Sequence, residues 1–438
     1  MARRNQFMKH GETTFRQLLE ANWKIPNEKI LKHFELTADE NGYPYIANWP
    51  DFIKEKDELE VFKTLMYYLL KKKLPLPLVT ISLDDIKELF WRYKNKNISP
   101  FVHGCDLNSP LIHRLSNDPY YHDYDKHSLG YFPQNISANK ISNYFAQKER
   151  MLCEVTNRES PTFLWTTEHG MSRLMDCLKR VHVTTLSEYG LKKVFGYAGQ
   201  VAAQFNVNTS KNIYNLLEGK SVFDISCGWG DRLTGFYLSN KEMYIGTDPN
   251  ENMFEIYKEM CQMYEKWLGN KNLKIIEKKH YFEFKGVKTV KIYNLPAEDL
   301  PYKDIPNVDV TFSSPPYFNK ELYGKDSKKE NDQSWKRYNS DDEWLNSFLY
   351  VVLDNMIPKS KSTLVNITDI GTDVRTNRKR ICDPMVDRYK KDFKGIAGFQ
   401  LSKNMNLVKN LDGIYTEPIW VFGDFPVKQK IDLMQLFA

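Results

Sequence analysis

The second half of the chain alternates short apolar runs with longer segments of helical periodicity. The apolar runs are rich in β-branched residues and predict strands, which we place at 222–226, 243–247, 288–293, 308–313 and 362–368, with a final pair at 396–402 and 417–422. We expect helices between them at 231–239, 251–267, 341–356 and 383–393. Strands that are apolar on both faces are typical of a parallel sheet covered on both sides. Residues 196–438 therefore predict an α/β domain with a mostly parallel sheet and helices on both faces.

Residues 1–195 show a different pattern. Helical periodicity marks the segments 56–73, 82–96, 138–156 and 169–181. The stretch 97–135 is rich in Asn, Pro, His and Tyr and is expected to form loops. We predict two domains, a mainly helical one at 1–195 and the α/β domain at 196–438. Within the second, the charged segment 318–340 is expected to be a mobile loop after a strand.

Composition narrows the class of protein. With 438 residues the chain is long enough for two or three domains. It holds no run of about 18 apolar residues and begins without an apolar leader, so we expect no membrane partner and a cytoplasmic, intracellular location. Its six cysteines lie far apart, which predicts neither a metal site nor a disulfide framework. A net charge of +6 is compatible with a polyanionic partner but does not require one.

A glycine turn follows the first predicted strand. Gly228 and Gly230 allow a tight turn and a close approach of the backbone to a ligand. Leu233 occupies the place of the third glycine of the dinucleotide fingerprint, so a pyrophosphate site is disfavoured. The second strand ends at Asp248, whose carboxylate can accept hydrogen bonds from ribose hydroxyls. Its separation from Asp224 is close to the spacing of about 20 residues expected for a ribose partner.

A third acidic turn follows the third strand, where Glu298 or Asp299 can accept from an adenine amino group. The three turns together resemble the first three motifs of class I S-adenosylmethionine (SAM)-dependent methyltransferases, which have a Rossmann-like fold. The segment 199–205 looks like the motif that precedes the first strand in amino-methyltransferases, although the usual proline after Phe205 is missing. The resemblance implies SAM as the cofactor. It implies a SAM site made of Phe205, Asp224, Ser226, Cys227, Gly228, Gly230, Asp248, Pro249, Glu298 and Asp299.

The fourth strand ends in Ser314, Pro315, Pro316 and Tyr317. Prolines cannot donate ladder hydrogen bonds, so the strand stops there with a stiff backbone. Such a motif suits methyl transfer to an exocyclic base amine, whose lone pair is delocalised into the ring. A serine hydroxyl and the Pro315 carbonyl would bind both amine hydrogens, stabilise the charge that develops on nitrogen, and leave the lone pair directed at the methyl group. Tyr317 would stack on the base, which must leave a duplex to reach this site.

The same stretch resembles the (Asp/Asn/Ser)-Pro-Pro-(Tyr/Phe) motif of DNA methyltransferases that modify N6 of adenine or N4 of cytosine. Segments 313–323 and 417–422 look like those in phage or viral members, and the resemblance covers about 196–424. It implies that Ser314, Pro315, Pro316 and Tyr317 are the catalytic residues. Serine in the first position is more typical of enzymes acting on cytosine N4, which gives that base a slight lead.

Several alternatives stay open at this point. The main hypothesis is a DNA base amino-methyltransferase with nucleic acid as its partner. The same site could serve an RNA base methyltransferase, a catalytically silent SAM-fold binding subunit, or an enzyme for a small-molecule or protein amine. By elimination, target contacts are expected from 1–195 and 318–340, where Lys94, Lys96, Lys328, Lys329 and Arg337 are among the candidate phosphate contacts. The oligomeric state, an accessory subunit and the recognised sequence are left open.

Overall fold

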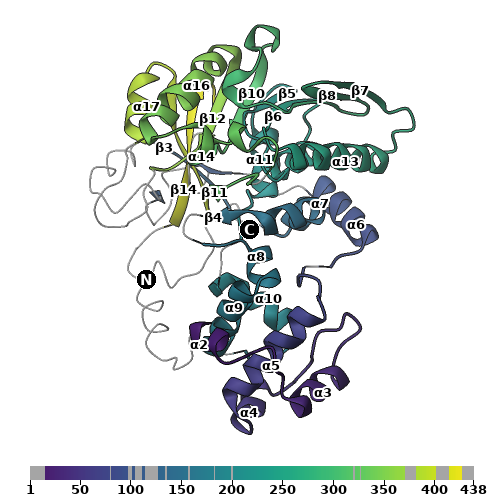
Figure 1. Cartoon of the computed structure of the whole chain (residues 1–438). Coiled ribbons are helices and arrows are strands. Elements are labelled where there is room, and N and C mark those ends of the chain that lie inside the picture. The colour runs from purple at the N-terminus through teal and green to yellow at the C-terminus, as the bar shows by residue number, and fades with distance from the viewer. Residues whose placement is uncertain are drawn as a thin grey trace, which may run out of the picture. The chain divides into compact units, whose positions relative to one another are not determined.

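Two compact units make up the chain in the computed structural model (Figure 1). The described residues are 15–78, 80–96, 101–103, 111–113, 127–133, 136–155, 158–181, 183–198, 201–318, 321–325, 327–369, 381–400 and 414–426. One unit comprises Met1–Thr80 and Gln147–Ala203, and the other comprises Ile81–Ala146 and Gln204–Ala438. The chain therefore passes between them three times. The last passage lies near the predicted boundary after residue 195, whereas residues 81–146, which we grouped with the N-terminal domain, cluster with the second unit.

The first unit is helical, as predicted. Its helices are α2 (Phe15–Glu20), α3 (Glu28–Leu36), α4 (Trp49–Lys54), α5 (Glu58–Lys71), α8 (Pro161–Thr166), α9 (Glu168–Arg180) and α10 (Glu188–Ala198), and it also contains the short strand β4 (Glu154–Val155). The helix α7 (Asn139–Leu152) belongs to both units: its residues up to 146 are part of the second unit, and those from 147 are part of the first. In α5 the buried side chains include Val61, Phe62, Leu65, Met66 and Leu69, the spacing of one helical face. This face belongs to the hydrophobic core of the unit.

The second unit is built on one mixed sheet. Its strands are β1 (Val102–His103), β2 (Leu111–His113), β3 (Ser128–Phe132), β5 (Ser221–Asp224), β6 (Met243–Thr247), β7 (Lys274–Lys278), β8 (Tyr281–Lys285), β9 (Thr289–Tyr293), β10 (Val308–Ser313), β12 (Ser360–Asn366), β13 (Phe393–Gln400) and β14 (Ile414–Gly423). The order along the sheet is β1-β3-β13-β14-β12-β10-β5-β6-β9-β8-β7, and β2 pairs with β14. The central strands β9, β6, β5, β10 and β12 are parallel, and β14 is antiparallel to both of its neighbours β12 and β13.

Helices cover both faces of this sheet. The helices of the unit are α6 (Leu83–Asn95), α11 (Val207–Leu216), α12 (Asp231–Leu238), α13 (Glu251–Trp267), α14 (Ser334–Arg337), α15 (Asp341–Trp344), α16 (Tyr350–Met356) and α17 (Cys382–Arg388). Phe312 of β10 contacts Tyr214 of α11. Its chain neighbour Thr311 lies opposite Phe223 of β5, which packs in the cluster that contains α16. Because neighbours along a strand point to opposite faces, α11 and α16 lie on opposite sides. The Rossmann-like α/β prediction is confirmed.

Some elements differ from those expected. The hairpin β7–β8 and the edge strands β1 and β3 were not predicted. The helix expected at 341–356 is divided into α15, a π-helical segment Leu345–Leu349, and α16. The expected loop 318–340 contains β11 (Glu321–Leu322), a 3-10 turn at Glu330–Asp332, and α14. Of the helices in the described part of the chain, none combines the length and apolar character needed to cross a membrane.

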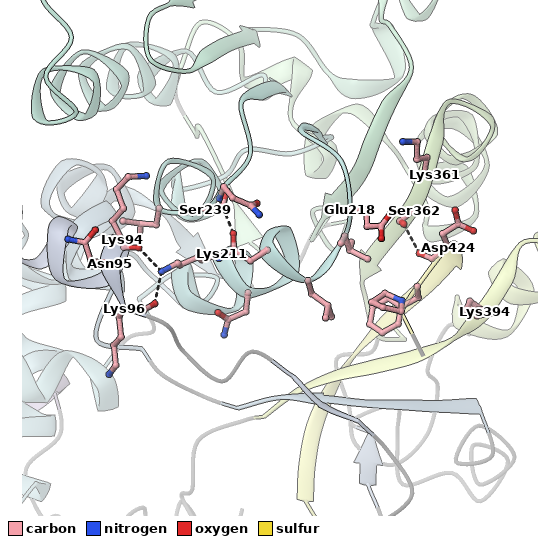
Figure 2. A pocket seen from close by; sticks show the side chains of 18 residues that line it. Lys94, Asn95, Lys96, Lys211, Glu218, Ser239, Lys361, Ser362, Lys394 and Asp424 are labelled. Atoms are coloured by element: carbon pink, nitrogen blue, oxygen red, sulfur yellow. Dashed lines mark hydrogen bonds between the residues drawn. The ribbon is translucent and has the colours of Figure 1, made fainter. Parts of the chain in front are cut away.

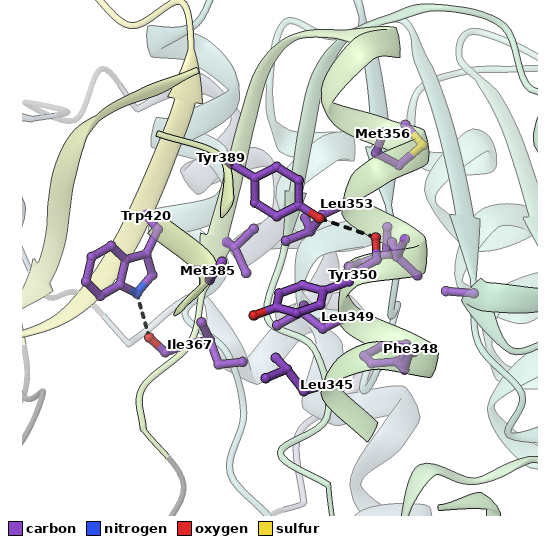
Figure 3. Packing of buried hydrophobic residues seen from close by; sticks show 14 of the residues in the cluster. Leu345, Phe348, Leu349, Tyr350, Leu353, Met356, Ile367, Met385, Tyr389 and Trp420 are labelled. Carbon is purple, nitrogen blue, oxygen red and sulfur yellow. Dashed lines mark hydrogen bonds between the residues drawn. The ribbon is translucent and has the colours of Figure 1, made fainter. Parts of the chain in front are cut away.

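A buried cluster fixes the strands that border the predicted catalytic motif. Side chains of α16 and α17 pack with Trp420 of β14 and with Ile367, which directly follows β12 (Figure 3). The Trp420 indole donates a hydrogen bond to the Ile367 carbonyl at 2.9 Å. The hydroxyl of Tyr389 donates to Asp354 at 2.8 Å across the same cluster. These contacts hold the carboxyl end of β12 and the adjacent part of β14 in one rigid layer.

Candidate cofactor-binding and catalytic site

The predicted site residues gather at one edge of the sheet. The turn 226–230 follows β5, Asp248 follows β6, the acidic turn 298–299 comes after β9, and residues 314–317 follow β10. These four strands are parallel neighbours, so their carboxyl ends meet at the same edge. Ligands of open α/β sheets bind at this edge. The structure thus brings together segments that are up to about 90 residues apart in the chain.

The glycine turn after β5 has the backbone that the sequence predicted. Gly228 and Gly230 have φ angles of 55° and 77°, which favour glycine. A Cβ at Gly230 would also lie 2.7 Å from the end of the Met260 side chain. Gly230 forms the N-cap of α12, so the turn leads directly into the helix. The carboxylate of Asp248 accepts from the Gly228 N–H at 2.7 Å and joins the first two turns.

Beneath this turn, Asp224 is fully buried. Its carboxylate accepts from Arg232 Nε at 2.8 Å and from the Tyr244 hydroxyl at 2.7 Å. Burial opposes the charge of Arg232, but the neighbouring Asp224 raises the pKa of the guanidinium above its usual range. Each charge is therefore compensated by its partner. Asp224 was expected in the SAM site; here it stabilises the turn from below while Ser226 and Gly228 are partly exposed.

Asp248 is nine per cent exposed and accepts a second hydrogen bond, from the Asn250 N–H at 3.0 Å. Burial raises its pKa from 3.8 to about 6, while the backbone hydrogen bonds act in the opposite direction. The carboxylate is therefore ionised at neutral pH and close to its titration range. Each oxygen has a second lone pair beyond the backbone bond, so the group retains capacity to accept from ribose hydroxyls.

The two candidates for adenine binding contact the segment that follows the catalytic motif. Arg337 makes a bidentate pair with Asp299, with both N–O distances at 2.7 Å, and its Nε lies 3.1 Å from Glu298. The Tyr338 hydroxyl also donates to Glu298. Burial raises the pKa of Glu298, and the hydrogen bond from Tyr338 lowers it. In this structure both carboxylates are engaged by side chains of the protein.

The same segment reaches the other two turns. The Lys329 amine donates to the carbonyl and side-chain oxygens of Asn294 at 2.7 and 2.5 Å, next to β9. The Lys328 N–H donates to Glu251, at the start of α13, at 3.0 Å. The rings of Tyr323 and Trp229 are 5.6 Å apart. Residues 321–338 are thus tied to the turns after β5, β6 and β9, and the expected phosphate contacts Lys329 and Arg337 make intramolecular bonds instead.

A chain of hydroxyls joins the glycine turn to the catalytic motif. Ser226 Oγ lies 2.7 Å from Ser313 Oγ and 3.0 Å from the Ser314 carbonyl. Ser313 Oγ donates to Asp224 at 2.8 Å. These three contacts share only two hydroxyl protons, one from each serine. Ser313 donates its proton to the charged Asp224, and the proton of Ser226 is therefore the one directed to the Ser314 carbonyl. The network fixes the start of the catalytic motif relative to the turn.

The predicted catalytic motif, residues 314–317, has no regular secondary structure. Pro315 is buried, while Ser314, Pro316 and Tyr317 are partly exposed. No residue in the described ranges forms a hydrogen bond with the Ser314 hydroxyl, which leaves it available as an acceptor. The backbone turns at Tyr317: the Phe318 N–H donates to the Pro316 carbonyl at 3.0 Å, and Phe318 has φ 43°. The Tyr317 hydroxyl lies 3.2 Å from Glu417 of β14.

Phe205 also lies near this edge. Its N–H donates to Asp231, the first residue of α12, at 3.1 Å. Its ring is 5.3 Å from that of Phe312 and 5.7 Å from the Arg232 guanidinium. The structure therefore places Phe205 against the helix that follows the glycine turn.

The remaining two candidates differ in exposure. Pro249 is partly exposed next to Asp248, whereas the Cys227 side chain is buried. Burial raises the pKa of the Cys227 thiol well above its ordinary value, so the thiol stays protonated and acts in packing. Among the described residues, no cluster of His, Cys, Asp and Glu suits a metal ion.

Four residues of the site were not found from the sequence: Arg232, Ser313, Asn294 and Glu417. Arg232 carried a signal, because a cation eight residues after a buried strand Asp is well placed to neutralise it. Ser313 directly precedes the motif and could have been included with it. Glu417 is separated from Tyr317 by 100 residues, and only the pairing of β12 with β14 brings it close.

A groove of about 1290 Å³ lies at the opposite, amino-terminal edge of the same sheet (Figure 2). It is lined by residues that precede or begin β5, β12 and β13, such as Glu218, Lys361 and Lys394. Two of its lysines are already bonded: Lys94 donates to the Tyr237 carbonyl at 3.0 Å, and Lys211 donates to the Lys96 carbonyl at 3.0 Å. Burial lowers the pKa of Lys211 to about 8. These lysines cap helix ends. Lys94 was predicted to be a phosphate contact, but here its amine is bonded to a carbonyl of the protein.

Comparisons with known proteins concern the fold. No family model and no curated protein matches the chain. Among solved structures, it is similar to a putative RNA methyltransferase from Pyrococcus horikoshii, with 15% identity over 50% of this chain and 85% of that one, at a TM-score of 0.25. It is also similar to Trm1 from the same organism in complex with S-adenosyl-L-methionine, with 17% identity over 51% and 57% of the two chains, at a TM-score of 0.30.

A third similar structure is an rRNA methylase from Streptococcus thermophilus, with 11% identity over 52% of this chain and 100% of that one, at a TM-score of 0.28. At these identities the likeness concerns the fold alone. What the site binds and does has to be argued from its own residues.

Proposed function

We propose that this chain is a SAM-dependent methyltransferase that modifies the exocyclic amino group of a base in DNA, with cytosine N4 slightly ahead of adenine N6. The observation that carries the proposal is the junction of the two motifs. Ser226 in the glycine turn lies within hydrogen-bond distance of the Ser314 carbonyl at the start of Ser-Pro-Pro-Tyr. A group bound at the turn and a base bound at the motif would therefore be neighbours.

The residues at the edge of the sheet fit SAM as the bound group. The exposed backbone of Gly228 lets a ligand approach closely, and Asp248 offers an ionised acceptor for ribose hydroxyls. Glu298 and Asp299 offer acceptors for the adenine amino group once Arg337 and Tyr338 release them. When bound, SAM supplies an electrophilic methyl group on a positively charged sulfur.

The motif supplies what an exocyclic amine requires. The Ser314 hydroxyl and the Pro315 carbonyl would accept the two amine hydrogens, which directs the nitrogen lone pair toward the methyl group. Both acceptors also stabilise the positive charge that nitrogen gains as its new bond to the methyl carbon forms and the methyl–sulfur bond breaks, which would leave the sulfur as the neutral thioether of S-adenosylhomocysteine. The product nitrogen then loses one proton to solvent, and no side chain of lowered pKa is needed. Tyr317 stacks on the base and holds it in line.

The serine in first position favours DNA cytosine N4 by resemblance alone, so the test compares substrates directly. Purified protein is incubated with labelled SAM and with matched DNA and RNA of the same sequence, followed by nucleoside mass spectrometry. Methylated cytosine or adenine from DNA supports the proposal and identifies the base. If RNA is labelled and DNA is not, the RNA alternative with the same chemistry is supported instead.

Controls separate binding from chemistry. Ser314→Ala removes one acceptor without touching the turn, so it is expected to reduce transfer by about 10- to 100-fold with SAM affinity unchanged. If the wild-type protein binds SAM but labels no polynucleotide, the proposal fails and a silent binding subunit or a methyltransferase for another amine takes its place. If it does not bind SAM, the cofactor assignment fails as well.

A further inference from the structure

Glu417 lies beside the catalytic motif without belonging to any predicted site. It is a partly exposed residue of β14, and its carboxylate lies 3.2 Å from the hydroxyl of Tyr317. Burial and the neighbouring Glu417 raise the pKa of the Tyr317 hydroxyl well above its usual value. The phenol therefore stays protonated, and its O–H donates a hydrogen bond to the Glu417 carboxylate. At 3.2 Å this is a long hydrogen bond, and its acceptor is a carboxylate oxygen.

The bond spans three strands. Tyr317 follows β10, Thr368 follows β12, and Glu417 belongs to β14. The Thr368 side chain lowers the pKa of the Tyr317 hydroxyl and therefore lies beside it. The hydroxyl is thus held between side chains from the two strands that the buried cluster fixes in one layer. Glu417 itself is fixed by its place in the ladder, where it pairs with Phe399 of β13.

The other end of Tyr317 is fixed by the backbone. Two prolines precede it, and the chain turns at it through the Phe318 N–H bond to the Pro316 carbonyl at 3.0 Å. A tyrosine side chain turns about two bonds only: an anchored hydroxyl oxygen fixes the first, and because the phenolic O–H prefers to lie in the plane of the ring, the position of its acceptor favours one setting of the second. Removing the anchor leaves the Cα in place but lets the ring turn.

We propose that Glu417 is a positioning residue for methyl transfer, which holds the Tyr317 ring in the plane on which the target base stacks. The inference rests on the proposed function, because it gives Tyr317 the role of stacking platform. Glu417 acts through Tyr317 and touches neither cofactor nor base. Its loss therefore changes how the base is held and leaves the cofactor site intact.

The test uses Glu417→Ala, Glu417→Gln, Tyr317→Phe and the double variant Tyr317→Phe/Glu417→Ala in the full-length protein. Losing a hydrogen bond to a charged group is expected to lower kcat/KM for the polynucleotide by about tenfold in Glu417→Ala and in Tyr317→Phe. Glu417→Gln keeps an acceptor and is expected to lose about twofold. The double variant is expected to lose no more than either single variant, because both remove the same bond.

A matched control breaks a similar bond elsewhere. Asp354→Asn weakens the 2.8 Å hydrogen bond from Tyr389, in the same cluster but away from the site, and is expected to leave kcat/KM unchanged. Fluorescence of 2-aminopurine placed at the target position reports stacking directly. It is expected to be quenched by stacking on Tyr317 in the wild-type protein and to be less quenched in Glu417→Ala, with the dissociation constant for SAM unchanged.

The outcomes are distinct. Wild-type kcat/KM in Glu417→Ala, additive losses in the double variant, or an equal loss in Asp354→Asn would each overturn the positioning role while the proposed function stands. An equal loss of SAM affinity in Glu417→Ala would assign Glu417 to the cofactor site instead. Absence of transfer by the wild-type protein to any polynucleotide would overturn the proposed function, and with it this inference.

Discussion

The Asp248 carboxylate offers the sharpest test of the cofactor site. It connects two turns by accepting from the Gly228 and Asn250 N–H groups at 2.7 and 3.0 Å. A ribose bound there would add charge-assisted hydrogen bonds, worth about 1.5–3 kcal/mol in total. Asp248→Ala is therefore expected to weaken SAM binding by about 10- to 150-fold, since about 1.4 kcal/mol corresponds to tenfold. Isothermal titration calorimetry with SAM measures this change.

Titration of the same group gives an independent signature. The pKa of Asp248 is about 6 in the free protein, and ribose hydroxyls donate to its ionised form. SAM affinity is therefore expected to be constant above pH 7 and to fall below pH 6, approaching tenfold per pH unit. For folding the sign is opposite: a raised pKa stabilises the folded state below about pH 4, and this contribution is lost as the pH rises through 6.

Asp248→Asn separates the ribose contact from damage to the turn. The amide keeps one acceptor oxygen but cannot titrate, so its SAM affinity is expected to be about tenfold weaker at pH 7.5 and independent of pH between 5 and 7. Equal affinities of wild-type and Asp248→Ala protein would refute the ribose assignment. A wild-type affinity that does not fall below pH 6 would refute the role of the ionised carboxylate.

Three further predictions concern neighbouring parts of the second unit. Gly230→Ala places a Cβ 2.7 Å from Met260 at φ 77° and is expected to lower the free energy of unfolding in urea by about 1–3 kcal/mol; an unchanged midpoint would contradict this. Arg337→Ala removes the partly exposed pair with Asp299 that adenine would have to displace, so calorimetry is expected to show SAM binding tighter on the order of fivefold, with stability changed by less than about 1 kcal/mol. Burial lowers the pKa of Lys288 to about 6, so the folded state binds fewer protons than the unfolded state up to about pH 10. Wild-type protein is therefore expected to gain stability over Lys288→Met between pH 6 and 9, and a constant difference would show that the amine keeps its ordinary pKa.

Much of the second unit could be predicted from the sequence because its central strands are apolar on both faces. β5, β6, β9 and β10 lie within two residues of the expected ranges. The hairpin β7–β8 was overlooked because Lys and Glu occupy three of the five positions of β7, which leaves only Ile275 and Ile276 as its apolar residues. The edge strands β1 and β3 are short and rich in polar and aromatic residues, and they are strands because β3 pairs with β13. Pairing of this kind is decided by tertiary context, which local pattern does not contain.

The candidate site shows the same division. Each motif could be located because glycines, prolines and acidic residues follow strands in a fixed order. The contacts between motifs could not be predicted from the sequence, because they join residues 80 to 100 positions apart. Examples are Ser226 with Ser314 and Tyr317 with Glu417. The segment 318–340 was expected to be mobile because it is charged. Charged residues are common both in solvated loops and in loops whose basic side chains form ion pairs with acidic turns. In the structure Arg337 forms such an ion pair with Asp299.

The hydroxyl network under the glycine turn has an evolutionary consequence. Two serine protons are divided among three acceptors, so the residues at 226 and 313 do not change independently. In a relative with glycine in place of Ser226, the Ser314 carbonyl has lost its donor, and Ser313 retains Asp224 as its only partner in the network. We therefore expect substitutions at these two positions to covary among homologues, with the pair inherited as one polar unit together with Asp224.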